Sequence, residues 1–228
     1  MAWSGGKDCS LALYRLLDQG DYEVVELHTT INKDTNRVGM HGVAKDLILA
    51  QSDRTGIPVQ FIEIPSDSTN ESYEKATKTY YKSLKERNVN HIGFGDIFLE
   101  DLKAYRDQML AVDGLKGIYP LWKEDTKALA KEFIHSGFEA ITCAAKQYAH
   151  TPCLAGLKFN IDFLQQLPKE VDLCGENGEF HSFVTNGPTY DSPISIRVKS
   201  VETHHYNFKD EDGIEHSTSF DFADLRLI

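Results

Sequence analysis

The sequence predicts an α/β fold, with a mostly parallel sheet covered by helices and then a smaller α+β part. Strand-like and helix-like segments alternate up to about residue 145, and beyond it Pro, Gly and Asp become frequent and the alternation stops. Such alternation builds βαβ units, whose crossover helices cover both faces of a parallel sheet. A chain of 228 residues suits one large domain with a smaller appendage. We therefore expect domains at residues 1–145 and 146–228.

The expected strands are short runs of apolar and β-branched residues. They cover residues 24–30, 59–64, 91–95, 118–121 and 138–143. The expected helices have apolar residues at helical spacing. They cover residues 11–17, 43–55, 70–87, 102–112 and 126–135. In the last third we expect a helix at 160–166, a strand at 194–198 and a hairpin turn at 210–213.

The composition is that of an acidic globular protein, 41% hydrophobic and 26% charged, with a net charge of −11. Residues 1–145 carry 17 basic and 22 acidic side chains, and residues 146–228 carry 7 and 13. This balance argues against a nucleic-acid-binding protein. The four cysteines have no zinc-site spacing, and without a signal peptide they indicate reduced thiols in a cytoplasmic protein. The longest apolar runs are too short to cross a membrane.

The clearest chemical motif is Ser4-Gly5-Gly6-Lys7-Asp8-Cys9-Ser10, directly before the first expected helix. Only three residues precede it, so the first strand is very short unless the N-terminus was trimmed or misassigned. Two glycines let the backbone approach an anion, which the N–H groups and the positive dipole end of the helix attract. Lys7 adds a full charge, Ser4 a hydroxyl donor, and Asp8 a carboxylate that could hold Mg²⁺. The alternative is a strand-to-helix turn that binds nothing.

The Ser-Gly-Gly-Lys-Asp string resembles the signature of the PP-loop ATP pyrophosphatase superfamily, whose members cleave ATP to AMP and pyrophosphate. They share an adenine nucleotide α-hydrolase-like, Rossmann-type fold and include GMP synthetase, NAD synthetase and tRNA-modifying enzymes. The resemblance implies ATP and Mg²⁺ as cofactors, with ATP held by residues 4–8 and by Ser10. Cys9 stands where the superfamily usually has serine, so that contact is either lost or covered by Ser10.

Further segments narrow the resemblance to the diphthine–ammonia ligase (diphthamide synthase) family, including its bacterial members. These segments are residues 29–32, 37–43, 94–101, 105–106, 120–122 and 174–183. The last segment is the most specific, because the other branches of the superfamily lack it. The resemblance covers nearly the whole chain. It implies an ATP site that includes Thr29, Gly95 and Asp96, with Asp8 and Asp96 as metal ligands. It also implies a substrate site that includes His41, Tyr105, Arg106 and Asn177.

Several of these residues have a plain structural alternative. Asp96 follows a short buried strand and could bind Mg²⁺ or position the ribose, or it could cap the next helix. His41 lies at the start of an expected helix and could meet substrate or phosphate, or serve packing alone. Tyr105 and Arg106 lie on one helix. In the structural alternative one of them is a core residue and the other pairs with a carboxylate at 100–101.

The segment Glu176-Asn177-Gly178-Glu179-Phe180-His181 gathers two carboxylates, an amide and an imidazole around a glycine. Its carboxylates could hold ammonium or accept its surplus proton, which is general-base chemistry. Together with the resemblance, this makes Glu176, Glu179 and His181 candidate catalytic residues beside Lys7 and Asp8. The alternative is an acidic turn before a strand.

The resulting hypothesis is an ATP-dependent, AMP-forming ligase that adenylates a carboxylate and lets ammonia displace AMP. The resemblance implies that the acid is diphthine on elongation factor 2 in archaea and eukaryotes. Bacteria lack diphthine, so a bacterial chain would use another acid. No membrane partner is expected. One alternative is a PP-loop tRNA-modifying enzyme, against which the acidic balance and the missing catalytic cysteine pair argue. The other is a non-catalytic ATP sensor, which would not need a pyrophosphate-specific loop.

Overall fold

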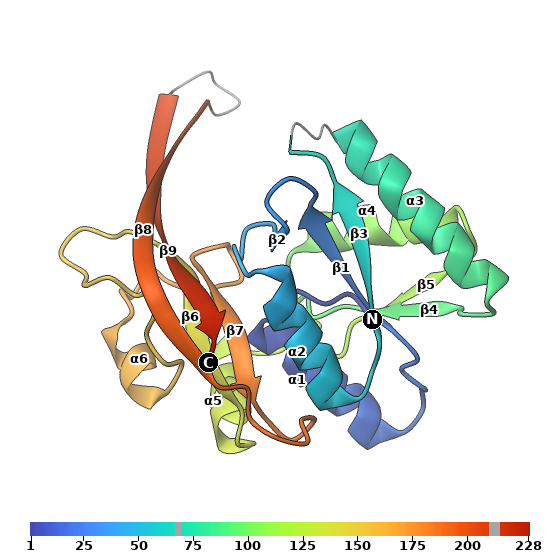
Figure 1. Cartoon of the computed structure of the whole chain (residues 1–228), viewed down its shortest axis with the longest axis horizontal. Coiled ribbons are helices and arrows are strands. Elements are labelled where there is room, and N and C mark those ends of the chain that lie inside the picture. The colour runs from blue at the N-terminus through green and yellow to red at the C-terminus, as the bar shows by residue number, and fades with distance from the viewer. Residues whose placement is uncertain (67–69, 210–214) are drawn as a thin grey trace.

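The computed structural model describes residues 1–66, 70–209 and 215–228 and has two halves, each built on a sheet (Figure 1). The helices are α1 (Lys7–Gln19), α2 (Lys45–Thr55), α3 (Asn70–Glu86), α4 (Glu100–Ala111), α5 (Thr126–His135) and α6 (Ile161–Gln166). The strands are β1 (Leu27–Asn32), β2 (Arg37–Val38), β3 (Val59–Ile64), β4 (His91–Gly93), β5 (Lys116–Ile118), β6 (Glu139–Lys146), β7 (Phe180–Asn186), β8 (Ile196–Lys209) and β9 (Glu215–Leu227). The hairpin turn predicted at 210–213 lies outside the described residues.

The N-terminal half is α/β, as predicted, with a parallel sheet that residues 1–3 complete. β1 pairs parallel with β3, and β4 pairs parallel with β5. Between them, Ala2 N donates to the Gly93 carbonyl at 2.9 Å, and Trp3 N donates to the His28 carbonyl at 2.8 Å. The very short first strand is therefore residues 1–3, and the spatial order is β3, β1, residues 1–3, β4, β5. The chain leaves this first strand toward one side and later returns to its other side, which creates a topological switch point beside it.

The C-terminal half is an antiparallel sheet in the order β7-β6-β9-β8. The strand predicted at 138–143 forms as β6, but its expected place in the parallel alternation is wrong, because it pairs antiparallel with β7 and β9. The change of sheet therefore precedes residue 139, and the predicted division at 145/146 falls inside β6. Local pattern reveals a strand, but it does not reveal which partner the strand will choose.

Most predicted helices are confirmed within a few residues, and Gly20 and Gly56 end α1 and α2 with φ of 70° and 68°. Three local predictions are wrong. α1 begins at Lys7 rather than residue 11. The strand expected at 118–121 lies at 116–118. His41 sits in a turn before α2 rather than in a helix. Glycine at the N-cap of α1 has no side-chain cap, which hides the true start from sequence patterns.

The two halves share one hydrophobic core, which contains buried residues of α1, α2, β6 and β7. Fully buried Gln51 on α2 connects them through hydrogen bonds. Its amide nitrogen donates to the carbonyls of Gly5 at 3.0 Å and Val184 at 2.8 Å, and its oxygen accepts from Trp3 Nε1 at 2.9 Å. The Gly5 carbonyl also accepts directly from Val184 N at 2.9 Å. Gln51 thus fixes the glycine-rich loop against β7.

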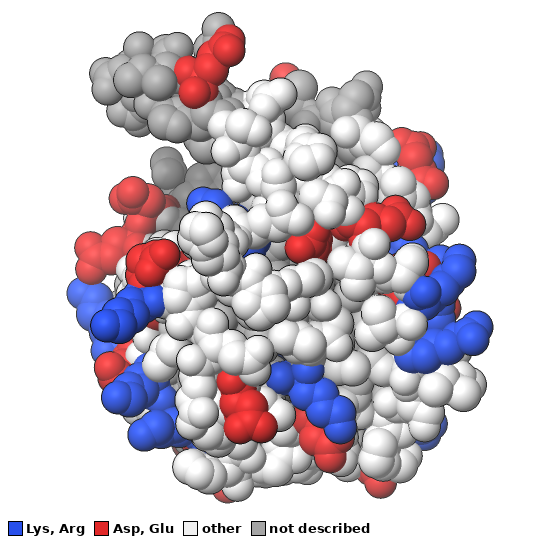
Figure 2. Space-filling model, turned by 90° about the vertical axis from the view of Figure 1, so that its left-hand side faces the viewer, with Lys and Arg blue, Asp and Glu red and all other residues white. Residues whose placement is uncertain are grey.

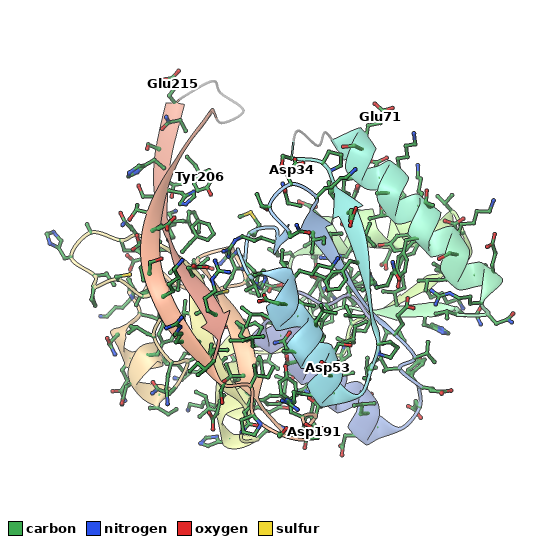
Figure 3. All side chains as sticks on the ribbon, viewed as in Figure 1. Asp34, Asp53, Glu71, Asp191, Tyr206 and Glu215 are labelled. Atoms are coloured by element: carbon green, nitrogen blue, oxygen red, sulfur yellow. The ribbon has the colours of Figure 1, made fainter. Side chains whose placement is uncertain are left out.

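The surface carries acidic groups on both halves. Figure 3 places Asp34 and Glu71 at one end of the parallel half, and Asp53 and Asp191 toward the opposite end of the molecule. On the face in Figure 2, Lys and Arg alternate with Asp and Glu around a largely uncharged middle. This face offers no continuous basic surface to a phosphate backbone. In the described residues, no helix is long and apolar enough to span a bilayer.

Candidate active site

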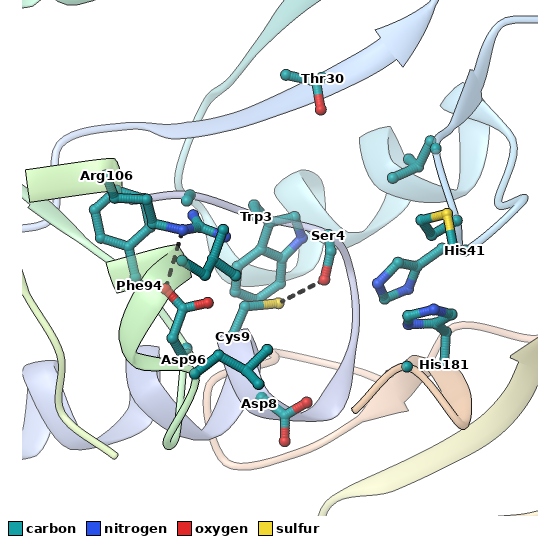
Figure 4. A pocket seen from close by; sticks show the side chains of 18 of the residues that line it. Trp3, Ser4, Asp8, Cys9, Thr30, His41, Phe94, Asp96, Arg106 and His181 are labelled. Carbon is teal, nitrogen blue, oxygen red and sulfur yellow. Dashed lines mark hydrogen bonds and ion pairs between the residues drawn. The ribbon is translucent and has the colours of Figure 1, made fainter. Parts of the chain in front are cut away.

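A cavity of about 460 Å³ opens at the carboxyl ends of the parallel strands, beside the topological switch point (Figure 4). Such edges bind ligands in open α/β sheets because the strand-to-helix turns converge there. Nine of the predicted site residues line the cavity: Ser4, Lys7, Asp8, His41, Gly95, Asp96, Arg106, Glu176 and His181. They come from both halves of the chain, so the sheets together form the site.

The glycine-rich loop needs both of its glycines. Gly5 has φ of +80°, and a Cβ there would lie 2.7 Å from the Gln51 side-chain oxygen. A Cβ on Gly6 would lie 3.0 Å from Cε1 of His41 and 3.2 Å from the Ser182 carbonyl. The loop leads directly into α1, whose first N–H groups and positive dipole end face the cavity region. This arrangement suits an anion.

Lys7 and Asp8 form an ion pair at the base of the loop. Lys7 Nζ donates to both Asp8 oxygens at 2.9 and 2.8 Å and also to the Cys174 carbonyl. Burial alone would lower the pKa of Lys7, but attraction to Asp8 outweighs it and raises the pKa. Burial raises the pKa of Asp8, which Lys7 opposes. Lys7 is therefore charged with all three ammonium protons engaged.

Asp96 and Arg106 pair across the other end of the cavity, with Arg106 Nε 3.1 Å from Asp96 Oδ2. The guanidinium also lies 4.5 Å from the centre of the Phe94 ring. The pairing of Arg106 with residue 100 or 101 is therefore wrong, as is the helix-cap alternative for Asp96, because Leu99 is the N-cap of α4. Asp96 Oδ2 belongs to this ion pair and makes no further hydrogen bond within the described residues. A carboxylate on a cavity wall can bind a cation as well as it binds Arg106.

The 172–179 loop crosses the cavity from the C-terminal half. The Asp172 carboxylate accepts the N–H groups of Cys174 at 2.9 Å and Glu176 at 3.2 Å, and the Thr126 hydroxyl at 2.6 Å. Glu179 is buried, and its Oε1 accepts from Asp172 N at 3.1 Å and Asn177 Nδ2 at 3.0 Å. Neither Glu179 nor Asn177 lines the cavity. In this geometry they fold the loop.

Glu176 is the carboxylate of this loop that lines the cavity. Its Oε1 accepts from the N–H groups of Ile97 at 2.7 Å and Phe98 at 3.3 Å. Burial raises its pKa to about 7, although these two backbone donors oppose the shift. A carboxylate with a pKa near neutrality can take a proton and return it at physiological pH.

His41 and His181 lie side by side on the cavity wall, with their rings tilted by 35° to each other (Figure 4). Burial holds the pKa of His41 well below its usual value and lowers that of His181 to about 4. Both imidazoles are therefore neutral at physiological pH. Neutral histidines in a cavity can donate to a ligand or accept from it.

The remaining predicted residues lie outside the cavity lining. Thr29 Oγ1 donates to the Trp3 carbonyl at 2.6 Å, and the neighbouring Thr30 lines the cavity instead. Ser10 Oγ donates to the Gly6 carbonyl at 2.9 Å, so it supports the loop from behind. Tyr105 is 38% exposed, with its hydroxyl 3.4 Å from Glu74. Cys9 does line the cavity, with its Sγ 3.6 Å from Ser4 Oγ.

Three supporting residues were given no role in the sequence analysis: Gln51, Asp172 and Ser182, of which Ser182 lies in the 174–183 segment. Ser182 Oγ accepts from Lys7 N at 3.0 Å and so anchors the start of α1 to β7. Asp172, two positions before Cys174, could have been noticed as a loop-closing carboxylate. Gln51 and Ser182 act over separations of 46 and 175 residues along the chain, and no local pattern marks them.

We expect Gly95→Ala to destabilise the protein where Gly95 packs against the start of α1. A Cβ at this position would lie 2.7 Å from both the carbonyl carbon of Asp8 and the nitrogen of Cys9. Backbone atoms cannot move aside cheaply, so we expect a loss of about 1–3 kcal/mol in unfolding free energy. Denaturant unfolding measures it. Gly39→Ala is the matched control, because nothing lies within 4 Å of a Cβ there. Equal stability of the two variants would contradict the packing argument.

Known proteins resemble this chain over both of its halves. Residues 1–117 match the diphthamide synthase N-terminal domain, and residues 125–217 match the diphthamide synthase C-terminal domain. A diphthine–ammonia ligase of Schizosaccharomyces pombe is 27% identical over 220 residues, covering 88% of this chain and 36% of that protein. A diphthine–ammonia ligase of Danio rerio is 26% identical over 136 residues, covering 54% of this chain and 52% of that protein. The chain thus spans about a third to a half of these relatives, and it belongs to the diphthamide synthase family.

Proposed function

We propose that this protein is an ATP-dependent, AMP-forming carboxylate–ammonia ligase of the diphthine–ammonia ligase type. The observation that carries the proposal is one cavity that combines two kinds of chemistry. The glycine-rich loop, Lys7 and the start of α1 form an anion-binding side. Glu176, with its pKa near 7, forms a proton-accepting side. Amide synthesis from a carboxylate, ATP and ammonia needs both.

The fold that we propose for the N-terminal half is the PP-loop, adenine nucleotide α-hydrolase-like fold. The strand order β3, β1, residues 1–3, β4, β5 supports this proposal, because it places the loop at the switch point next to Gly95 and Asp96. ATP would lie with its β- and γ-phosphates on residues 4–8. Its α-phosphate would then be open to attack by the carboxylate, and pyrophosphate would leave against Lys7 and the dipole of α1.

Mg²⁺ would be held by Asp8 and Asp96 with the help of phosphate oxygens. Asp8 is half-buried at the cavity, and the Asp96 carboxylate lines the same cavity in its ion pair with Arg106. No group of three or more His, Cys, Asp and Glu side chains in the described residues could hold a metal alone. This fits a metal that arrives with the nucleotide and takes most of its ligands from phosphate and water. Bound there, the ion would neutralise phosphate charge.

After adenylation, ammonia would attack the acyl group and AMP would leave. Glu176 would take the surplus proton of ammonium, and the 172–179 loop would hold its carboxylate in place. The acid would be diphthine if this chain shares the substrate in its relatives' names.

The two parts of the chain would have different roles in this reaction. Residues 1–145 would bind ATP, and residues 146–228 would supply the ammonia side. The location of the protein would be cytoplasmic. His41 and Arg106 would contact substrate from opposite ends of the cavity.

Two other functions are less well supported. A tRNA-modifying enzyme would need a basic surface, whereas both parts of this chain are acidic. A non-catalytic ATP sensor would not need a partly buried carboxylate with a pKa near 7 in the same cavity as the glycine-rich loop. The family match favours the ligase over both.

Turnover should release AMP and pyrophosphate. The loop grips the terminal phosphates, so the bond between the α- and β-phosphates is the one that breaks. ³¹P NMR of ATP, Mg²⁺, ammonium and a diphthine-bearing acceptor distinguishes the products. ADP and phosphate as the main products would contradict the proposed mechanism. Pyrophosphate that forms without ammonium, and an amide that needs it, would place adenylation before ammonia attack.

A further inference from the structure

Two partly buried histidines face each other on the cavity wall next to the glycine-rich loop (Figure 4). His41 comes from the turn before α2, and His181 comes from β7. Their ring centres lie 4.5 Å apart with 35° between the planes. The pair abuts the loop, because Cε1 of His41 would touch a Cβ on Gly6 at 3.0 Å. The two rings therefore belong to the anion-binding side of the cavity.

The hydrogen bonds of the pair leave capacity for a ligand. His41 Nδ1 lies 3.3 Å from the Ser182 carbonyl, which can only accept, so Nδ1 carries the proton and Nε2 holds a lone pair. His181 Nε2 is buried and has no hydrogen-bond partner within the described residues. Buried ring nitrogens are normally satisfied, and an orphan one on a cavity wall indicates a group that is bound during function.

We propose that His41 and His181 form a proton-linked subsite for the terminal phosphates of ATP. One proton enters the stacked pair when the polyphosphate binds, and it leaves again with pyrophosphate. Protonated His181 carries an N–H on both ring nitrogens, so Nε2 donates to a phosphate oxygen. The proton comes from solvent, and no covalent bond changes. The inference rests on the proposed function only in taking ATP as the ligand.

The charges around the pair favour proton uptake only when a polyanion is present. From α1, Lys7 opposes protonation of both rings, and Asp8 neutralises Lys7 through the ion pair. From β6, the Cys143 thiol lies 4.0 Å from His41 Nδ1 and is uncharged, because burial raises its pKa to about 12. Around the turn itself, Arg37 donates to the Gly42 carbonyl and is paired with Asp224.

The two remaining neighbours do not hold the pair protonated either. β9 presents Phe222 to Gly42, with His204 of β8 behind the phenyl ring. The 172–179 loop presents Glu176, which is itself half-protonated near neutral pH. Without ligand the pair is neutral, since burial dominates. A polyphosphate adds several negative charges and reverses that balance. One proton is the limit, because two charged rings 4.5 Å apart would repel.

Isothermal titration calorimetry with the α,β-methylene analogue of ATP and excess Mg²⁺ tests the inference. The titrations are run between pH 6 and 8 in buffers of different ionisation enthalpy. We expect wild type to take up about one more proton than His181→Gln. We also expect the affinity of wild type for the analogue to increase about tenfold more than the affinity of His181→Gln when the pH is lowered from 8 to 6. The difference between the two proteins cancels the titration of the ligand itself. His135→Gln, exposed at the end of α5, is the matched control and should behave as wild type.

The outcomes separate this inference from the proposed function. Wild type that fails to bind the analogue at any pH overturns both. Tight binding with the same proton count in wild type and His181→Gln overturns the histidine subsite alone. His41→Gln is the second variant and should lose the same proton, so the test stands if one variant folds poorly by circular dichroism. Equal proton uptake in wild type, His181→Gln, His41→Gln and His135→Gln would mean that the pair stays neutral when the analogue binds, which would overturn the inference.

Discussion

Glu176→Gln should lower the rate of amide formation about 10²-fold while leaving ATP affinity within about threefold. Glutamine keeps an oxygen that can accept from Ile97 N and Phe98 N, so the 97–98 backbone stays in place. It loses the negative charge and the basic oxygen that would take the proton of ammonium, and loss of a general base costs a factor of this size. Amide formation is followed by mass spectrometry of the acceptor, and ATP affinity by calorimetry.

The pH dependence gives an independent readout of the same role. The pKa of Glu176 is raised to about 7, so the carboxylate is protonated below pH 7 and free to accept a proton above it. The rate of amide formation in wild type should therefore rise with pH through about 7, after correction for the fraction of ammonia. Glu176→Gln should lose this step.

Glu179→Gln is the matched control for this prediction. Glu179 is also a buried glutamate of the 172–179 loop, but it lies outside the cavity lining and accepts from Asp172 and Asn177 through one oxygen that glutamine retains. The rate of amide formation should therefore fall far less in Glu179→Gln than in Glu176→Gln. A full 10²-fold loss in Glu179→Gln, with Glu176→Gln near wild type, would exchange the two roles.

Much of the cavity lining was predicted from the sequence, because short-range patterns mark these residues. The loop at residues 4–8 combines glycines, a cation and a helix start, and each of these has a local physical purpose. Asp96 and His41 each follow a short strand, where side chains can reach a crevice. Ser4, Lys7, Asp8, His41 and Asp96 all line the one cavity. What local pattern could not decide was orientation: of Glu176 and Glu179, three positions apart, one faces the cavity and the other closes the loop.

The parts that escaped prediction depend on contacts between distant segments. β6 reads as a strand in any sheet, and only its pairing with β7 and β9 places it in the antiparallel half. Arg106 had carboxylates nearby in the chain, yet it pairs with Asp96, because the turn after β4 brings that side chain under α4. Ser182 caps the N–H of Lys7 from the other sheet. Sequence separation hides such partners, although each is an ordinary hydrogen bond or ion pair.

Lys7→Ala should weaken ATP binding by about 1.5–3 kcal/mol, or roughly ten- to 150-fold, the scale of a charge-assisted hydrogen bond to phosphate. The loss has two sources. The ammonium no longer meets the phosphates, and Asp8 is left without its partner beside a polyanion. Calorimetry with the α,β-methylene analogue of ATP measures the affinity, and an unchanged value would remove the loop from the ATP site.

The double variant Lys7→Ala with Asp8→Asn separates the two sources. If Asp8 only pairs with Lys7, neutralising it should restore part of the lost affinity, since the repulsion of phosphate disappears. If Asp8 also holds Mg²⁺, the same change should restore affinity when Mg²⁺ is absent but reduce it further when Mg²⁺ is present. The single variant Asp8→Asn sharpens the distinction, because it frees Lys7 from the ion pair that engages it without ligand. Tighter binding without Mg²⁺ and weaker binding with it would establish that Asp8 exchanges Lys7 for the metal. Identical effects in both conditions would refute the metal role of Asp8.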